Sequence, residues 1–90
     1  MAKMTTEEAF VKVLQNHGIE NAFGIIGSAF MPISDLFPAA GITFWDVAHE
    51  TNGGLIADGY TRATGKMSMV IAQNGPGITG LVTPIKTAYW

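Results

Sequence analysis

Residues 41–65, GITFWDVAHETNGGLIADGYTRATG, place an apolar run directly before a glycine-rich amphipathic segment. The two patterns predict a buried strand over 42–48 and a helix over 51–64. Glu50 lies at the junction between them. In parallel α/β sheets such junctions face the crevice where ligands bind, so Glu50 is a candidate for chemistry.

The N-terminal segment predicts a helix that begins after Thr5. Thr5 and Glu8 have the spacing of a capping box, and Gly18 stops the helix. Its apolar spacing predicts one face toward the core, with His17 half-buried at the end of that face. The predicted face consists of Phe10, Val13, Leu14 and His17.

The remaining elements complete an alternating pattern. Apolar runs predict strands over 22–26 and 67–72, and Pro32 favours a short helix over 32–37. A last helix is predicted from residue 78 onward, with a kink or a late start at Pro84. The order αβαβαβα predicts an α/β fold, a parallel sheet with helices on both faces.

Two of these helices have predicted core-facing sides. Asp58 and Arg62 lie four residues apart and are expected to pair on another side of the helix over 51–64. The core-facing side of that helix is predicted to hold Asn52, Leu55, Ile56, Gly59, Tyr60 and Ala63, and that of the last helix Ile78, Leu81, Val82, Ile85, Ala88 and Tyr89.

Composition narrows the function classes. The chain has 90 residues, of which 48% are hydrophobic and 13% charged, a balance too apolar for a disordered chain. The net charge of -2 offers no basic surface, so we expect no nucleic-acid partner and no membrane partner. Since there is no cysteine and no signal-peptide core, we expect a cytoplasmic location.

Unpaired edges suggest a larger unit. Three parallel strands alone leave apolar edges uncovered, and the last helical pattern runs to Trp90 without a cap. We therefore expect residues 1–90 to be a truncated part of a longer domain.

Common phosphate and zinc motifs do not match. Gly24 and Gly27 form only a Gly-x-x-Gly pair, whereas a dinucleotide fingerprint needs three glycines, and Gly65-Lys66 leads into a strand instead of the helix of a P-loop. The two histidines have no cysteine or paired acid at ligand spacing, so we expect no metal ligands in this chain.

Glu50 has both a structural and a functional interpretation. A carboxylate in the first turn of a helix is stabilised by the helix dipole by about 0.3–1 kcal/mol and often does nothing else. Its apolar and glycine neighbours favour a further role, because desolvation would raise the pKa of Glu50 and suit it to protonate a ring nitrogen.

Two loops of the same sheet edge are further candidates. Gly75-Pro76-Gly77 forms a common turn, but a loop without bulky side chains also lets a flat heterocycle lie against it. Ser28 follows the first strand and either orients a polar group of a substrate or caps the next helix.

Four ordered motifs resemble those of one family. In order and spacing they resemble the start of the pyrimidine-binding domain of thiamine-diphosphate enzymes related to acetolactate synthase, over the whole chain. Segments 24–29, 31–38, 44–46 and 73–77 are most similar to the acetyltransferases that act on sulfoacetaldehyde. The motifs are Phe23-Gly24-Ile25-Ile26-Gly27-Ser28-Ala29, Ala48-His49-Glu50-Thr51-Asn52, Ala57-Asp58-Gly59-Tyr60-Thr61-Arg62-Ala63-Thr64-Gly65 and Asn74-Gly75-Pro76-Gly77.

The resemblance implies thiamine diphosphate as cofactor and a role for each matched residue. Glu50 would be catalytic, because it would hydrogen-bond N1′ of the aminopyrimidine and promote formation of the thiazolium ylid. Ile25 and Pro76 would flank the pyrimidine. Gly27, Ser28 and Ala29 would lie in a loop near a small-molecule substrate. The implied reaction converts sulfoacetaldehyde and phosphate into acetyl phosphate and sulfite.

The resemblance also implies parts that this sequence does not match. The family holds Mg²⁺ and the diphosphate through a Gly-Asp-Gly motif and a later Asn in a separate domain, whereas Asp58-Gly59 has no leading glycine. A full-length relative would be a homodimer or a homotetramer, and this chain alone would be inactive.

Three alternatives stay open. Ile25 and Ile26 stand where acetolactate synthases commonly have Tyr-Pro, and Gly80 stands where they often have Asn, which argues against acetolactate chemistry. A fragment of an acetolactate synthase-like lyase, a decarboxylase fragment and a non-catalytic α/β interaction module are nonetheless the competing interpretations.

Overall fold

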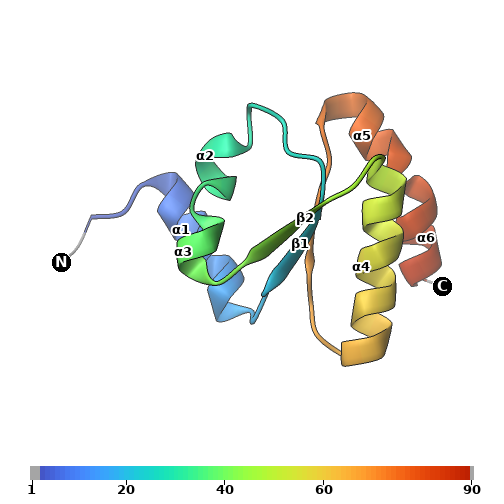
Figure 1. The fold of residues 1–90 in the computed structure, drawn as a ribbon, viewed down its shortest axis with the longest axis horizontal. Coiled ribbons are helices and arrows are strands. Elements are labelled where there is room, and N and C mark those ends of the chain that lie inside the picture. The colour runs from blue at the N-terminus through green and yellow to red at the C-terminus, as the bar shows by residue number, and fades with distance from the viewer. Residues whose placement is uncertain (1–2, 90) are drawn as a thin grey trace.

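The computed structural model describes residues 3–89, and Trp90, on which the predicted uncapped helix end depends, lies outside them. None of the helices within these residues is long and apolar enough to cross a bilayer. The elements, shown in Figure 1, are α1 Thr6–Asn16, β1 Asn21–Gly24, α2 Met31–Ser34, α3 Phe37–Ala40, β2 Thr43–Asp46, α4 Glu50–Thr64, β3 Met69–Ile71, α5 Asn74–Gly80 and α6 Val82–Tyr89.

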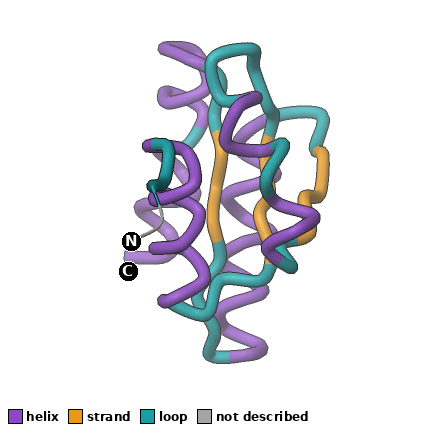
Figure 2. Tube along the Cα trace, turned by 90° about the vertical axis from the view of Figure 1, so that its left-hand side faces the viewer, coloured by secondary structure: helices purple, strands orange, loops and turns teal. Residues whose placement is uncertain are grey.

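The three strands form one parallel sheet in the order β2-β1-β3. Helices α1, α2 and α3 lie on one side of it and α4, α5 and α6 on the other (Figure 1), so the predicted α/β fold with helices on both faces is confirmed. Figure 2 shows the strands side by side from the α1 to α3 side. Each strand is shorter than predicted: the pairing ends at Gly24, Asp46 and Ile71, and β2 and β3 also begin later than predicted.

The core lies between the sheet and the first three helices. Phe37 of α3 is 1% exposed, and Phe30 packs edge-on against it with ring centroids 6.1 Å apart. Two short helices, α2 and α3, replace the single helix predicted over 32–37, because Pro38 fits the first turn of α3 instead of ending the connection. The buried cluster consists of Val11, Leu14, Ile19, Ala22, Phe37, Ile42 and Ile71.

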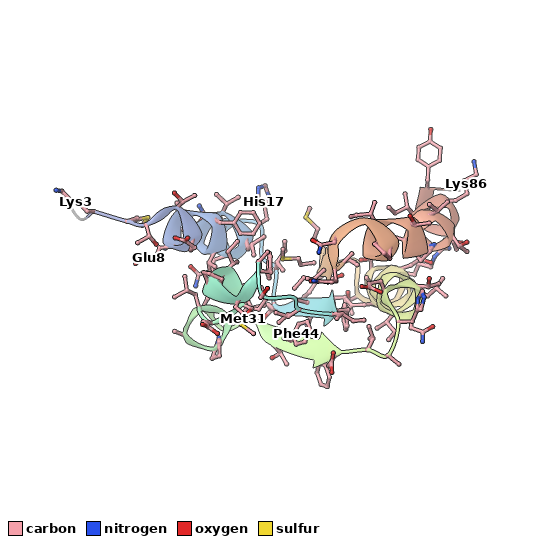
Figure 3. The ribbon with its side chains drawn as sticks, turned by 90° about the horizontal axis from the view of Figure 1, so that it is seen from above. Lys3, Glu8, His17, Met31, Phe44 and Lys86 are labelled. Atoms are coloured by element: carbon pink, nitrogen blue, oxygen red, sulfur yellow. The ribbon has the colours of Figure 1, made fainter. Side chains whose placement is uncertain are left out.

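Helix α1 confirms the predicted cap and only part of the predicted face, of which Leu14 is buried. Thr5 Oγ1 accepts from the Glu8 N–H, and Glu8 Oε1 accepts from the Thr5 N–H, both at 3.1 Å. The buried residues are Val11 and Leu14, whereas Val13 is 53% exposed. The predicted half-buried His17 is wrong, since it follows the last residue of α1 and is exposed (Figure 3).

Helix α4 presents small residues to the sheet. Gly53, Gly54 and Ala57 are buried, while Leu55 and Ile56 of the predicted face are 42% and 46% exposed. A β-carbon on Gly53 would lie 3.2 Å from Gly24 Cα, so the helix and β1 approach almost backbone to backbone. The hydrophobic pattern pointed to the wrong side of α4 because it assigns the core to the largest apolar residues, whereas close packing selects the smallest.

The predicted late start at Pro84 is confirmed. Helix α5 ends at Gly80 and α6 begins at Val82, so Pro84 lies in the first turn of α6. Backbone N–H groups in the first turn of a helix have no intrahelical acceptor, so the missing N–H of proline costs no hydrogen bond there. The predicted core-facing side of this region is mostly wrong: Leu81 is buried, but Ile78, Val82 and Ile85 are more than 60% exposed.

Replacing Gly54 with Ala is expected to destabilise the protein by about 1–2 kcal/mol. A β-carbon there would lie 2.5 Å from Pro84 Cβ, and the rigid proline ring cannot turn aside. The matched control is Gly59→Ala in the same helix, where nothing lies within 4 Å and alanine should stabilise by about 0.5–1 kcal/mol. Urea unfolding of the purified variants measures both changes. Equal stabilisation by the two alanines would contradict the close contact between Gly54 and Pro84.

Candidate functional site

The candidate site lies where the three strands end. In the observed register Gly24 pairs with Asp46 on one side and with Ile71 on the other, so the carboxyl ends of the strands lie side by side. The loops that follow them lead to α2, α4 and α5. In open α/β sheets this edge holds ligands. The predicted convergence of the loops at one edge is therefore confirmed.

Glu50 is the first residue of α4 and its side chain is turned into the protein. The residue is 9% exposed, and its Oε2 accepts a hydrogen bond of 3.1 Å from the backbone N–H of Gln73 at the start of α5. The backbone N–H of Glu50 also bonds its own carboxylate. Two backbone N–H groups thus hold the carboxylate in place.

Local contacts fix the start of α4. His49 is the N-cap residue, and its Nδ1 accepts from the Thr51 N–H at 3.1 Å. The Thr51 hydroxyl donates to the carbonyl oxygen of Gly80, which ties the first turn of α4 to the end of α5. These contacts hold Glu50 from both sides along the chain.

The predicted direction of the pKa shift is wrong. Burial does raise the pKa of Glu50, but the Gln73 N–H, followed by the backbone N–H of Glu50, lowers it more, and His49 lowers it further. The net effect is a pKa below the usual value of a glutamate. Because hydrogen bonds to the charged form outweigh desolvation, Glu50 is a carboxylate at neutral pH.

Gly75-Pro76-Gly77, predicted as a turn before a helix that starts at residue 78, instead forms the first turn of helix α5 and lies directly against this carboxylate. Asn74 has φ of 52°, a left-handed conformation that asparagine tolerates, and so redirects the chain from β3 into α5. Gly77 is buried, and a β-carbon there would lie 2.7 Å from Glu50 Oε2. Pro76, by contrast, is exposed on the same turn.

The loop after β1 reaches the same place. Ile25 is half-buried, and its N–H donates to the Ile71 carbonyl at 3.2 Å, which holds the loop beside β3. A β-carbon on Gly27 would overlap Oε1 of Gln73, so this loop touches the residue that binds Glu50. The structure therefore brings Gly27, Gln73 and Glu50 together.

Ser28 and Ala29 lie farther out on this loop and are exposed. The N-cap residue of α2 is Phe30, which has no side-chain cap, so Ser28 does not cap the helix by its hydroxyl. Its possible role as a helix cap is thus not realised.

Sequence reasoning missed three parts of the site. Gln73 acts through its backbone N–H, for which a sequence carries no signal. His49 serves as a cap, although Ser, Thr, Asp and Asn are the residues usually expected there. The contact of Thr51 with Gly80 joins segments 29 positions apart, which no local pattern reveals.

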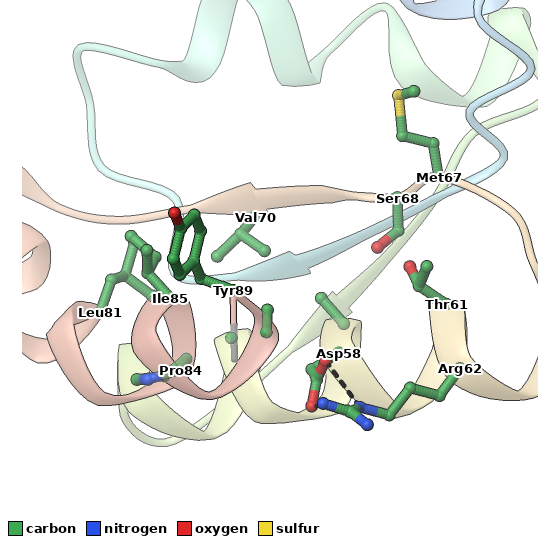
Figure 4. Close-up of a pocket in the computed structure, with 13 residues that line it drawn as sticks. Asp58, Thr61, Arg62, Met67, Ser68, Val70, Leu81, Pro84, Ile85 and Tyr89 are labelled. Atoms are coloured by element: carbon green, nitrogen blue, oxygen red, sulfur yellow. Dashed lines mark hydrogen bonds and ion pairs between the residues drawn. The ribbon is translucent and has the colours of Figure 1, made fainter.

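An apolar groove of about 770 Å³ lies elsewhere, between α4, α6 and β3 (Figure 4). Asp58 and Arg62 pair on its rim at 3.0 Å, which confirms the predicted ion pair. Neither Glu50 nor Gln73 lines this groove. The groove and the candidate site are therefore distinct features.

Comparison with known proteins identifies the family. A family model for the thiamine pyrophosphate enzyme, N-terminal TPP binding domain, matches residues 4–90. Similar proteins include sulfoacetaldehyde acetyltransferases from Roseovarius nubinhibens, 80% identical over 88 residues, and from Rhodobacter capsulatus, 75% identical over 88 residues; both alignments cover 98% of this chain and 15% of the relative. An acetolactate synthase from Arthrospira platensis is 38% identical over 91 residues, which cover 97% of this chain and 16% of that protein. The chain thus spans about 15% of the length of its curated relatives, and it belongs to the thiamine pyrophosphate enzymes, whose N-terminal TPP binding domain it matches over residues 4–90.

Proposed function

We propose that this chain is the N-terminal part of a thiamine-diphosphate-dependent acetyltransferase that converts sulfoacetaldehyde and phosphate into acetyl phosphate and sulfite. The names of the relatives at 75% and 80% identity support sulfoacetaldehyde as the substrate and the transfer of an acetyl group. The observation that carries a catalytic role is the position of Glu50, which is buried at the carboxyl edge of the sheet with one oxygen bound to the Gln73 N–H.

The residues at this edge fit the pyrimidine end of the cofactor. Bound thiamine diphosphate would supply a carbon nucleophile for the aldehyde. Glu50 would use Oε1 to bind ring atom N1′ and would keep Oε2 on Gln73. Gly77 has no side chain and so leaves the space that Glu50 Oε2 fills, and Gly27 leaves the space that the Gln73 side chain fills.

The other loop residues are assigned outward from this point. Ile25 and Pro76 would contact the faces of the pyrimidine, and Ser28 and Ala29 would lie on the substrate side of Gly27. The exposure of Ser28, Ala29 and Pro76 supports this assignment, since a ligand at the edge of the sheet could reach all three.

The rest of the cofactor would be held outside these 90 residues. We propose that Mg²⁺ and the diphosphate bind another domain, that the complete enzyme is a homodimer or homotetramer, and that it works in the cytoplasm. The chain spans about 15% of its relatives, which supports a further binding domain in the complete protein. We expect residues 1–90 alone to be inactive.

Release of sulfite tests the proposed reaction. The enzyme that contains this chain is expected to release sulfite from sulfoacetaldehyde and to form acetyl phosphate in equal amount, only when phosphate and thiamine diphosphate are both present. Colorimetric sulfite detection and a hydroxamate assay for acetyl phosphate measure the two products. Formation of acetolactate from pyruvate without any sulfite release would instead favour the acetolactate synthase-like alternative, to which the 38% identical relative corresponds.

A further inference from the structure

Gly77 occupies the tightest point around the Glu50 carboxylate. It is buried in α5, and a β-carbon built on it would lie 2.7 Å from Glu50 Oε2, closer than real β-carbon contacts allow. The same β-carbon would lie 3.1 Å from two atoms of Ala72. An alanine at this position could be accommodated only if the carboxylate moved and Ala72 shifted by a few tenths of an ångström.

The turn that contains Gly77 also holds the carboxylate. The Gln73 N–H donates to Glu50 Oε2 at 3.1 Å, and the Gly77 N–H donates to the Gln73 carbonyl at 3.1 Å. One residue of this turn therefore binds Oε2, and another leaves the space that Oε2 fills. Displacing Oε2 from this space would also weaken its bond to Gln73.

The surroundings prevent an easy adjustment. The contact of Thr51 with the Gly80 carbonyl joins α4 to α5, so the helices cannot simply slide apart. A β-carbon on Gly80 would itself lie 3.1 Å from His49 Cε1, which shows how closely the two helix ends approach. The flexible member of this group is the Glu50 side chain.

We infer that Gly77 is a positioning residue for Glu50: its missing side chain lets Oε2 bind the Gln73 N–H and thereby directs Oε1 toward the ligand. Gly77 does not touch the reacting atoms in this arrangement. The effect of Gly77 on catalysis rests on the proposed role of Glu50. The close contact between Gly77 and Glu50 does not depend on that role.

The functional test is Gly77→Ala in the complete enzyme, measured as exchange of the C2 proton of bound thiamine diphosphate by quenched-flow NMR. No aldehyde is present, so the result does not depend on the substrate. Displacing a catalytic group by about 1 Å can slow a reaction by up to about 100-fold, so we expect proton exchange to slow by about 10- to 100-fold. Gly59→Ala, in open space on α4, should leave the rate unchanged.

A double-mutant cycle separates positioning from general damage. If Gly77 acts through Glu50, adding Gly77→Ala to Glu50→Gln should slow exchange less than about twofold further, because the two changes affect one group. The inference would be overturned if the double variant slowed exchange by the product of the two single effects, or if Gly77→Ala alone exchanged at the normal rate. A normal rate in Glu50→Gln would instead refute the proposed catalytic role of Glu50, so the two failures are distinguishable.

A second readout needs no cofactor. Gly77→Ala should lower the thermal unfolding midpoint of the cofactor-free enzyme, and Glu50→Ala should recover part of that loss by removing the clashing carboxylate. The same double variant covers the case in which Gly77→Ala alone does not fold. Failure of Glu50→Ala to recover any stability would show that the clash is not with Glu50 and would overturn the inference.

Discussion

Replacing Glu50 with Gln is expected to slow exchange of the C2 proton of bound thiamine diphosphate by about 100- to 10,000-fold in the complete enzyme, the range typical for loss of a general acid or base. The amide has nearly the same shape as the carboxylate but cannot exchange a proton with a ring nitrogen. Its oxygen can still accept from the Gln73 N–H, which now bonds Oε2 at 3.1 Å, so the fold should persist. Proton exchange followed by NMR measures the rate, and circular dichroism checks the fold.

Glu20→Gln is the matched control for this substitution. Glu20 is an exposed carboxylate that pairs with Lys66 at 3.1 Å and precedes β1, at the amino end of the sheet. Exposed pairs of this kind contribute about 0–1 kcal/mol, so this variant should keep both its fold and its exchange rate. If Glu50→Gln exchanged as fast as the control, Glu50 would have only a structural role at the start of α4.

Replacing Gly24 with Ala is expected to destabilise the protein by at least about 3 kcal/mol, the largest stability change that we predict. The β-carbon would lie 2.0 Å from the Ile71 carbonyl oxygen and 2.8 Å from its carbon, and both atoms belong to the backbone of β3. Gly24 also has φ of 149°, a conformation that side chains rarely adopt. Overpacking and backbone strain each cost about 1–3 kcal/mol, and here they act together in the central strand.

Gly41→Ala separates the two causes. Gly41 has φ of 77° but nothing within 4 Å of its β-carbon position, so alanine there should cost only the left-handed conformation, about 1–2 kcal/mol. The shift of the first urea unfolding transition of the purified protein measures both variants. Equal shifts for Gly24→Ala and Gly41→Ala would mean that the sheet can yield at Ile71, contrary to the structure.

Local signals predicted the elements well. The capping box of Thr5 and Glu8 formed as expected, and Pro84 delayed the start of α6 as its missing N–H required. The position of Glu50 between a strand and a helix was likewise readable, because the change from strand to helix periodicity is a local property of the chain.

The choice of buried faces was not readable from hydrophobicity. In α4 the large residues Leu55 and Ile56 are exposed, while Gly53 and Gly54 face the sheet and α6. Which side of a helix is buried depends on how closely its neighbours approach. Hydrophobic periodicity carries no information about that distance.

The sequence by itself determined the alternation of helical and strand segments, the parallel α/β class and the family, because capping, periodicity and motif spacing are local. Only the tertiary structure decided the chemical state of Glu50. Its lowered pKa and the direction of its carboxylate depend on the Gln73 N–H and on the missing side chain of Gly77, which lie 23 and 27 positions away along the chain. A backbone N–H is present at almost every residue, so only folding selects the one that meets the carboxylate.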